Sequence, residues 1–327
     1  EGRSREIDNN INAAIARLRN FQNSDGSFSY WPGGNYYNAW SVAYVGHFLV
    51  EAKNLGYVIP SGMIENWIRH QKKAVETWDP NYERVVYGYS NWNNSRNQML
   101  QAYRLYTLAK AGKPLLGAMN RLRNQDILND RARWHLAGAF SLAGKNEVAH
   151  QLIKEVNVNV KPYRYMGGNF GSSNRYRAIV LETMVQIGKK TEAKDLLISV
   201  CKNLGSKDWM STQEIAYSLM AIGQYIGKTN PDDELKIAYQ LGNQNLINAG
   251  TKLPLYQKKF DVDNLNTKKV TIKNTSGQSI FATVSLEGQP LVGLERLEKS
   301  KLDIDVEYKS TSGKTIDPKK IAQGTDF

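Results

Sequence analysis

The stretch FQNSDGSFSYWPGG, residues 21–34, decides the fold, because it is the clearest copy of a unit that recurs along the chain. It combines an Asp-Gly-Ser turn, the three aromatic residues Phe28, Tyr30 and Trp31 that follow the turn, and Pro-Gly-Gly, and it joins two segments whose apolar residues have helical spacing. Looser copies, each an aromatic, Gly/Ser-containing loop before a polar capping residue, begin at Tyr87, Phe170 and Trp209. The first two thirds of the chain are therefore predicted to repeat a helix–loop–helix unit around a centre.

The predicted helices alternate between strongly apolar ones and amphipathic ones. A helix that is apolar on more than one face is buried on more than one side, whereas a single apolar face indicates an outer position. Short links between such helices suit a closed ring or a solenoid, and the lack of a fixed repeat length favours the ring. A complete six-pair ring would need one pair more than the sequence provides, and we expect that first pair upstream of Glu1. Ten helices are predicted, at residues 7–21, 37–55, 61–77, 95–111, 114–123, 131–143, 146–156, 173–187, 191–204 and 211–226.

The pattern changes near Thr229–Pro231. All 7 tryptophans lie before residue 210, and the period of apolar residues then falls to two, which predicts strands. The predicted fold class is therefore mainly α: an α/α-toroid of antiparallel helix pairs, followed by a smaller, truncated β-sandwich region. These strands could form one small sandwich or pieces of two. The predicted strands are residues 235–241, 253–260, 269–273, 280–286 and 302–308.

Composition excludes several classes of protein. The net charge of +12 falls almost entirely on residues 1–228, since residues 229–327 hold 14 Lys and Arg against 13 Asp and Glu. These cations are scattered among acids along the helices, so we expect a solvated basic surface and no nucleic-acid partner. No window approaches a membrane-spanning helix, and no membrane insertion is expected. The single cysteine, Cys201, excludes an internal disulfide framework and a cysteine-built metal site.

Several segments, taken together and in order, resemble the bacterial branch of the α2-macroglobulin family. They include LRNFQNSDGSFSYWPGG (18–34), SRNQMLQAYRLYTLAKAGKP (95–114), SSNRYRAIVLETMVQIG (172–188) and WMSTQEIAYSLMAIGQY (209–225), followed by VTIKNTSGQSIFATVSLEGQP (270–290) in the β part. The resemblance implies three parts: a thioester-domain-like toroid over residues 1–228 without its first helix pair, strands of a CUB-like sandwich over 229–294, and the truncated start of a macroglobulin-like domain over 295–327.

The resemblance also implies a function, broad-range peptidase (endopeptidase) inhibition by trapping the peptidase after it cleaves a bait region. The implied partners are other macroglobulin-like domains of the same parent chain and target peptidases, and the implied location is extracytoplasmic, in the periplasm or cell envelope. The family's Gly-Cys-x-Glu-Gln thioester motif is absent from the chain, and Cys201 lies in Val-Cys-Lys-Asn. The thioester of the family would fall before Glu1, and residues 89–98 lack the histidine that assists acyl transfer in complement-type relatives. We therefore expect no catalytic residue and no enzyme activity in this chain.

Enzyme alternatives need acids that the loops supply only in part. A terpene cyclase would need an Asp-rich acid motif, which is absent. A carbohydrate-active α/α-toroid enzyme, either a glycoside hydrolase or a lyase, would need two carboxyls facing one cleft. Asp25 is predicted to form a turn and Glu214 to complete a capping box with Ser211. No His-x-x-x-His spacing occurs, so no metal and no cofactor are expected. The acids at the loops are Asp25, Asp79, Glu83, Asp208 and Glu214.

Aromatic residues gather in the predicted loops and form a candidate aromatic mouth surface. They would either pack between loops and helix ends or form an exposed concavity that docks a neighbouring macroglobulin domain or a ligand. Beside an upstream thioester, such a concavity would keep water away from it. The members are Phe28, Tyr30, Trp31, Tyr36, Tyr37, Trp40, Tyr87, Tyr89, Trp92, Tyr163, Tyr165 and Phe170.

Overall fold

The chain divides into two compact units, Glu1–Asn230 and Pro231–Phe327, in a computed structural model. Each unit is described by itself. The side chains of residues 2–4, 92–96 and 164–165 are not described. The structure describes residues 2–80, 92–160, 164–165, 171–227, 234–252, 256–260, 269–277, 280, 282–286, 305–324 and 326.

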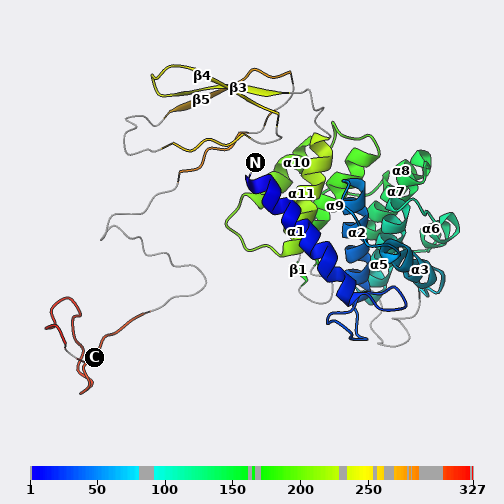
Figure 1. Cartoon of the computed structure of the whole chain (residues 1–327), viewed down its shortest axis with the longest axis horizontal. Coiled ribbons are helices and arrows are strands. Elements are labelled where there is room, and N and C mark those ends of the chain that lie inside the picture. The colour runs from blue at the N-terminus through cyan, green and yellow to red at the C-terminus, as the bar shows by residue number, and fades with distance from the viewer. Residues whose placement is uncertain are drawn as a thin grey trace. The chain divides into compact units, whose positions relative to one another are not determined.

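The first unit contains ten α-helices within the described residues, which confirms the mainly helical prediction (Figure 1). A 3₁₀ turn, Arg19–Phe21, follows the first helix, and two short strands, β1 (Arg164–Tyr165) and β2 (Gly171–Ser172), precede α9. The helices are α1 (Gly2–Leu18), α2 (Ala39–Asn54), α3 (Met63–Glu76), α5 (Trp92–Lys110), α6 (Leu116–Arg123), α7 (Asp130–Leu142), α8 (Asn146–Ile153), α9 (Ser173–Gln186), α10 (Lys194–Leu204) and α11 (Thr212–Ile226).

Alternate helices form an inner ring. α2 packs on α5, α5 on α7, α7 on α9 and α9 on α11, while α3, α6, α8 and α10 each pack outside their inner partners. Side chains close the ring between α11 and α2: Trp40 Nε1 donates to Gln213 Oε1 at 3.1 Å, and the rings of Tyr44 and Tyr217 stack at 5.9 Å. The arrangement is the predicted toroid of antiparallel pairs.

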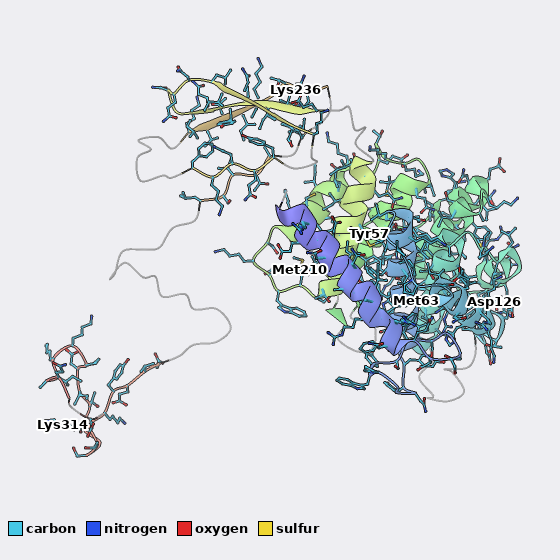
Figure 2. All side chains as sticks on the ribbon, in the orientation of Figure 1. Tyr57, Met63, Asp126, Met210, Lys236 and Lys314 are labelled. Carbon is cyan, nitrogen blue, oxygen red and sulfur yellow. The ribbon has the colours of Figure 1, made fainter. Side chains whose placement is uncertain are left out.

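The inner helices are inside because their sequences leave little polar surface. In α7, residues 134–140 are all buried, and α9 is buried over most of its length. The outer helix α3 instead buries one face, through Met63, Ile64, Trp67 and Val75. Apolar residues on several faces of a helix drive burial from several sides. The side chains of both sets fill the interior of the unit (Figure 2).

Polar caps begin most inner helices. The predicted capping box of α11 is confirmed, with Ser211 Oγ accepting from Glu214 N and Glu214 Oε2 accepting from Ser211 N. Asn38, Asn129 and Ser172 cap α2, α7 and α9 in the same way, each by accepting from backbone N–H groups. The helix predicted from residue 61 begins at Met63, after Gly62, whose left-handed backbone starts the helix without a side-chain hydrogen bond.

Four inner helices end in the same way, on a glycine with a positive φ. In α5, Gly112 N bonds to Ala109 O, and Lys113 N reaches back to Leu108 O at 2.9 Å, which is the bond pattern of a Schellman ending. The same pair of bonds follows α2, α7 and α9. A left-handed residue is needed there, and glycine adopts that conformation without strain. The glycines are Gly56, Gly112, Gly144 and Gly188, with φ of +95°, +72°, +73° and +85°.

The second unit contains an antiparallel three-stranded sheet within the described residues, in the order β4–β3–β5. β3 (Leu235–Leu241) lies between β4 (Ile247–Thr251) and β5 (Val270–Asn274), so Ala238 pairs with Asn248 on one side and Lys273 on the other. The strands predicted over 235–241 and 269–273 are confirmed. β4 was not predicted.

The strands predicted over residues 253–260, 280–286 and 302–308 are wrong wherever the structure describes these residues. Residues 256–260, 282–286 and 305–308 form no named strand, and the remainder of those predicted segments lies outside the described residues. Between Lys309 and Thr315 a single antiparallel bridge closes a tight turn at Gly313. The sheet has one partly buried face, to which Tyr239 contributes by packing against Phe260 at 5.5 Å. Residues 270–274 of β5 are all exposed.

Candidate functional site

The loop formed by residues 21–34 is held in place by several hydrogen bonds and by a close contact with α3. Asp25 Oδ1 accepts from both the backbone N–H and the hydroxyl of Ser27, at 2.9 and 2.7 Å. Gly26 lies so close to α3 that an added Cβ would meet the Asn66 carbonyl oxygen at 2.1 Å. Gln22 Nε2 donates to the Met63 carbonyl oxygen at 2.9 Å, which fixes the loop to the start of α3. Asp25 is therefore a turn former, as predicted.

The second half of this loop presents four aromatic side chains to solvent. Tyr30 N donates to Tyr36 O at 3.1 Å and Gly34 N to Trp31 O at 3.0 Å, so the backbone forms a small closed turn. Trp31 and Tyr36 are 76% and 74% exposed, and the rings of Tyr30 and Tyr36 stack at 5.8 Å. We call Tyr30, Trp31, Tyr36 and Tyr37 the loop surface.

The other members of the candidate aromatic mouth surface divide into three groups. Phe28 and Trp40 are buried in the core, at 3% and 4% exposed, so these two aromatic residues serve packing and do not form an exposed surface. For Trp92 and Tyr165 only the backbone is described, in α5 and β1. Tyr87, Tyr89, Tyr163 and Phe170 lie outside the described residues.

The loop acids serve local structure or lie at the surface. Burial alone would raise the pKa of Asp25, but the hydrogen bonds from Ser27 and the nearby His70 lower it. Glu214 is buried within its capping box. Asp79 and Asp208 are exposed, and Glu83 lies outside the described residues.

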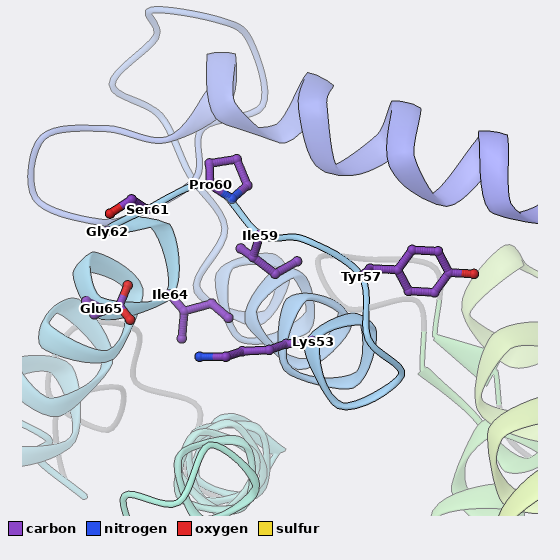
Figure 3. A pocket seen from close by; sticks show the side chains of 8 residues that line it. All are labelled: Lys53, Tyr57, Ile59, Pro60, Ser61, Gly62, Ile64 and Glu65. Carbon is purple, nitrogen blue, oxygen red and sulfur yellow. The ribbon is translucent and has the colours of Figure 1, made fainter.

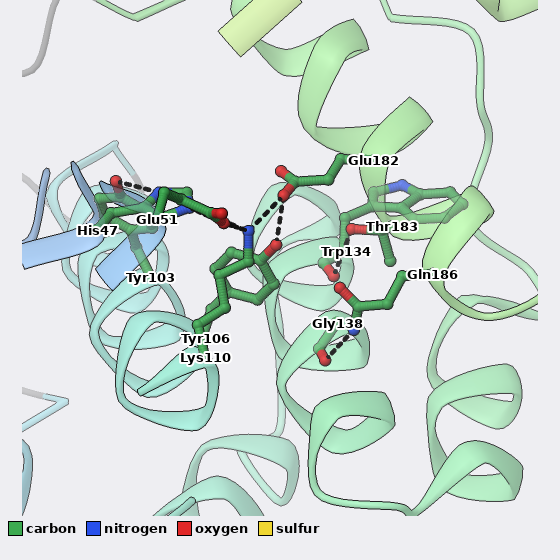
Figure 4. A network of polar contacts seen from close by, with 10 residues as sticks. All are labelled: His47, Glu51, Tyr103, Tyr106, Lys110, Trp134, Gly138, Glu182, Thr183 and Gln186. Atoms are coloured by element: carbon green, nitrogen blue, oxygen red, sulfur yellow. Dashed lines mark hydrogen bonds and ion pairs between the residues drawn. The ribbon is translucent and has the colours of Figure 1, made fainter. Parts of the chain in front are cut away.

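A cluster of charged groups lies in the ring interior, where α2, α5 and α9 face one another (Figure 4). Lys110 Nζ donates to Glu182 Oε1 at 3.0 Å, also to Glu51 Oε1, and approaches His47 Nε2 at 3.2 Å. The Tyr106 hydroxyl donates to the same Glu182 oxygen at 2.6 Å. We call His47, Glu51, Tyr106, Lys110 and Glu182 the axial cluster.

The protonation states of the axial cluster follow from these contacts. Desolvation alone would raise the pKa of Glu51, but His47 and Lys110 lower it to about 2, and Lys110 likewise lowers the pKa of buried Glu182. The two carboxylates outweigh desolvation at Lys110 and raise its pKa. Burial and the adjacent ammonium lower the pKa of His47, so its imidazole is neutral. Because an ammonium only donates, His47 Nε2 accepts and Nδ1 donates to the Tyr103 hydroxyl, 3.1 Å away.

The axial cluster has the ligand set of a metal site, but a lysine takes the cation position. One ligand atom each from His47, Glu51 and Glu182 lies within 4.8 Å of the others, and imidazole with carboxylates is a set that zinc binds. The Lys110 ammonium contacts all three of these side chains. The positive charge that would otherwise come from an ion is thus supplied by the chain itself.

A second polar group lies at the other end of the inner helices, near their N-termini. The buried Arg175 donates from Nη1 to Gln213 Oε1 at 2.9 Å, and its guanidinium lies 4.4 Å from the ring centre of Trp40 and 5.9 Å from that of Tyr217. Between the two groups lies His135, whose pKa burial lowers to about 3. Cation–π contacts with Trp and Tyr support a guanidinium in such a position.

Sequence reasoning did not find the axial cluster, although it carried a weak signal. His47 and Glu51 are four residues apart on the strongly apolar helix α2, and Glu182 interrupts the apolar sequence of α9. Charged residues on a face that must be buried need partners. Lys110, the partner, is 59 residues from Glu51 and 72 from Glu182, and only the ring closure brings them together.

A pocket of about 340 Å³ lies beside the link between α2 and α3 (Figure 3). Its walls mix apolar groups, such as Ile59, Pro60 and Ile64, with the charged side chains of Lys53 and Glu65. None of the predicted site residues lines it. Cys201 is likewise apart from the loop surface: it is a free, half-buried thiol on α10 whose pKa is raised by desolvation.

The fold and interior define a class of protein: an α/α-toroid whose axis is filled by paired charges and aromatic rings. No family model matches the chain. Two curated relatives do. Alpha-2-macroglobulin of Escherichia coli K12 is 27% identical over 211 residues, 62% of this chain and 12% of that protein. Alpha-2-macroglobulin of Xylella fastidiosa is 22% identical over 218 residues, 62% of this chain and 13% of that protein.

Solved structures of bacterial alpha-2-macroglobulins share the fold. Native E. coli alpha-2-macroglobulin matches with a TM-score of 0.57 at 22% identity, over 82% of this chain and 16% of that one. An E. coli fragment from domain MG7 to the C-terminus matches with the same TM-score and identity, and 40% of it is covered. Salmonella alpha-2-macroglobulin reacted with methylamine matches with a TM-score of 0.56 at 21% identity, over 80% of this chain and 16% of that one.

The chain is thus similar to bacterial alpha-2-macroglobulins in sequence and in fold. The chain spans about an eighth of the length of the two curated relatives. Among the described residues, no helix is long and apolar enough to cross a membrane.

Proposed function

We propose that the chain is part of a peptidase inhibitor that traps its target after bait cleavage, and that it acts as a structural and docking domain without catalysis of its own. The observation that carries this proposal is the kinship with bacterial alpha-2-macroglobulins, of which the E. coli protein has been solved in forms activated by trypsin and by porcine elastase. The partners would be target peptidases and other domains of the parent chain. The site of action would be outside the cytoplasm, in the periplasm or cell envelope.

The interior of the ring supports a role without turnover. Hydrolysis of a glycosidic bond would need two carboxyls facing one cleft, one of them free to donate a proton. Glu51 and Glu182 are instead both bound to Lys110, and Glu214 is bound to its own helix start. This use of the buried acids favours the inhibitor over the carbohydrate-active enzyme.

Covalent capture would need groups outside residues 1–327. Methylamine, with which the Salmonella relative was reacted, is a nucleophile of the kind that opens a thioester. The single cysteine here, Cys201, is half-buried on α10 and lacks the Gly-Cys-x-Glu-Gln context. If the parent protein forms a thioester, its cysteine belongs to another part of that protein.

The division of the chain follows from the same proposal. Residues 1–228 would be the thioester-domain-like toroid, 229–294 CUB-like strands and 295–327 the start of a macroglobulin-like domain. An apolar stripe on α11 would be covered by another part of the parent protein. Ile215, Leu219 and Ile226 are 37%, 56% and 46% exposed, although they share one face of an inner helix. Such a face is normally covered by a neighbouring helix.

The loop surface would dock a neighbouring macroglobulin-like domain. Exposed Tyr and Trp side chains on a rigid backbone are the residues that anchor protein interfaces, because they bury much area with little loss of side-chain entropy. The closed turn around Trp31 and the contact of Gly26 with α3 already order this loop. Docking would therefore need little further ordering of the loop.

The trap is tested on the full parent protein with one peptidase and two substrates. Digestion of a large protein substrate should fall, while hydrolysis of a small peptide substrate should continue, because a caged peptidase still admits small molecules. Equal inhibition of both substrates, or of neither, would contradict trapping. Trp31→Ala should weaken the domain contact and change the rate of trapping. Val58→Ala, which removes an equally exposed apolar side chain elsewhere, should not.

A further inference from the structure

One buried guanidinium in the helical unit has no acidic partner among the residues that the structure describes. Arg104 lies on α5, one turn after Gln101, whose Nε2 donates to the Val75 carbonyl oxygen at 3.1 Å. Residues three apart share a helix face, so Arg104 also faces the α3 side of α5. Its Nε is buried and has no hydrogen-bond partner in the described part of the chain. The residue as a whole is half-buried, so the Nη end of the guanidinium is the accessible end.

The electrostatic surroundings of Arg104 lack a compensating carboxylate among the described residues. Desolvation lowers the pKa of Arg104 to about 10, and the opposing contribution comes from Tyr37, not from an acid. Asp25, an acid of the adjoining loop, directs Oδ1 to Ser27 and Oδ2 to His70 Nδ1, 3.3 Å away.

Tyr37 connects this charge to the loop surface. Its ring packs edge-on against the imidazole of His70, with 5.5 Å between ring centres, and the residue is 39% exposed. Burial and the Arg104 charge together lower the pKa of His70, against a smaller opposing effect of Asp25. The imidazole is therefore neutral, and His70 holds the Tyr37 ring in place without competing for an anion.

We propose that Arg104 and Tyr37 form a carboxylate-binding site, filled in the parent protein by an acidic side chain of the segment that docks on the loop surface. The identity of the occupant rests on the proposed docking function; the site itself does not. A buried cation is stable when it is paired, and the planar guanidinium fork fits the two oxygens of a carboxylate. The Tyr37 hydroxyl supplies an additional donor.

The site is tested on the full 327-residue chain with acetate and with an acetylated, amidated peptide that carries one glutamate between leucines. Acetate replaces chloride at constant ionic strength, and the Arg104 Nε–H signal is followed by ¹⁵N NMR. The signal is identified by its loss in Arg104→Lys. We expect a saturable shift, and binding to Arg104→Gln weakened by about tenfold or more, the range of a lost charge-assisted hydrogen bond. Arg121→Gln is the matched control, because Arg121 is already bound to the Val75 carbonyl oxygen at 2.6 Å.

The outcomes separate the site from its occupant. No saturable shift with acetate, or equal acetate binding by Arg104→Gln, overturns the site. Arg104→Lys keeps the positive charge but lacks the planar guanidinium, and it replaces Arg104→Gln as the test if that variant does not fold. Undiminished acetate binding by Arg104→Lys also overturns the site. If acetate binds but the glutamate peptide does not, the acidic side chain as occupant is overturned. Trp31→Ala should weaken the peptide and spare acetate. If it spares both, the docking function fails while the anion site stands.

Discussion

The axial cluster and the loop surface both place side chains in an unfavourable environment: charged groups in the ring interior and aromatic rings in water. The charged groups are paired with one another, whereas the aromatic rings are left exposed. Inside the ring, two carboxylates and an ammonium are removed from water but satisfy one another. On the loop, Trp31 and Tyr36 keep about three quarters of their surface exposed, while two backbone hydrogen bonds close the turn that carries them. The interior is complete as it stands, whereas the loop is rigid and uncovered. A rigid and uncovered aromatic surface is what the proposed docking function requires.

The largest expected effect is at the axial cluster. Lys110→Met leaves the buried Glu182 and the partly buried Glu51 without their cation, and we expect the free energy of unfolding to fall by about 3–5 kcal/mol. Urea denaturation measures it. Lys113→Met, at an exposed position one turn on, should change stability by less than about 0.5 kcal/mol. A loss no larger than that of the control would show that the cluster does not hold the ring together.

The anchor of the loop should give the second largest effect. Gly26→Ala places a Cβ at 2.1 Å from the Asn66 oxygen and also strains a backbone with φ of +89°, so we expect a loss of about 2–3 kcal/mol. Gly33→Ala is the matched control, since Gly33 has a similar φ of +72° but no atom within 4 Å of the added Cβ, and it should cost about 1 kcal/mol. Equal losses in thermal or urea denaturation would mean that the contact with α3 does not fix the loop.

Acid should weaken the interior by a smaller amount. The pKa of Glu51 is about 2 in the fold against 4.5 in the unfolded chain, and that of Glu182 is also lowered. A lowered folded-state pKa gives stability that is complete above pH 4.5 and is lost as the pH falls towards 2. Because Glu51 is about one third exposed, we expect its contribution to be about 1–2 kcal/mol. Urea denaturation at several pH values gives the free energy of unfolding as a function of pH, and this free energy should change less with pH in Glu51→Gln than in the unchanged protein. An equal pH dependence in both would assign the loss to other carboxyls.

The smallest effect on stability is expected at the loop surface. Trp31→Ala removes a side chain that is 76% exposed, so the free energy of unfolding should change by less than about 0.5 kcal/mol. The same measurement on Trp67→Ala, whose ring is fully buried and donates to the Val42 carbonyl oxygen, should give a loss several times larger. A large loss for Trp31→Ala would mean that the loop aromatics serve the fold and not a partner.

Local signals predicted local structure well in this chain. The capping box of Ser211 and Glu214, the turn at Asp25 and the glycine endings were all visible, because each depends on residues a few positions apart. The helix predicted from residue 61 starts two residues later, because Gly62 adopts the left-handed conformation at the cap position. The inner and outer helices also followed from their apolar faces, and with them the ring.

Contacts that depend on ring closure could not be predicted. The sequence places Lys110 at the end of a helix, where a lysine is ordinarily a solvated partner of the helix dipole. Arg104 is a similar case, since nothing in its sequence neighbourhood separates a half-buried arginine from a surface one. β4 was missed because Ile247–Thr251 contains Asn, Ala and Gly, which form strands only when a neighbouring strand supplies the hydrogen bonds.

The repeated glycine endings have a consequence for how such a ring can evolve. Gly112, Gly144 and Gly188 are each followed by a lysine, and each closes its helix with the same two backbone bonds. A two-helix module that stops by its own local chemistry does not depend on the module that follows. Duplication or loss of a whole module would therefore change the circumference of the ring while leaving the ends of the remaining helices unchanged.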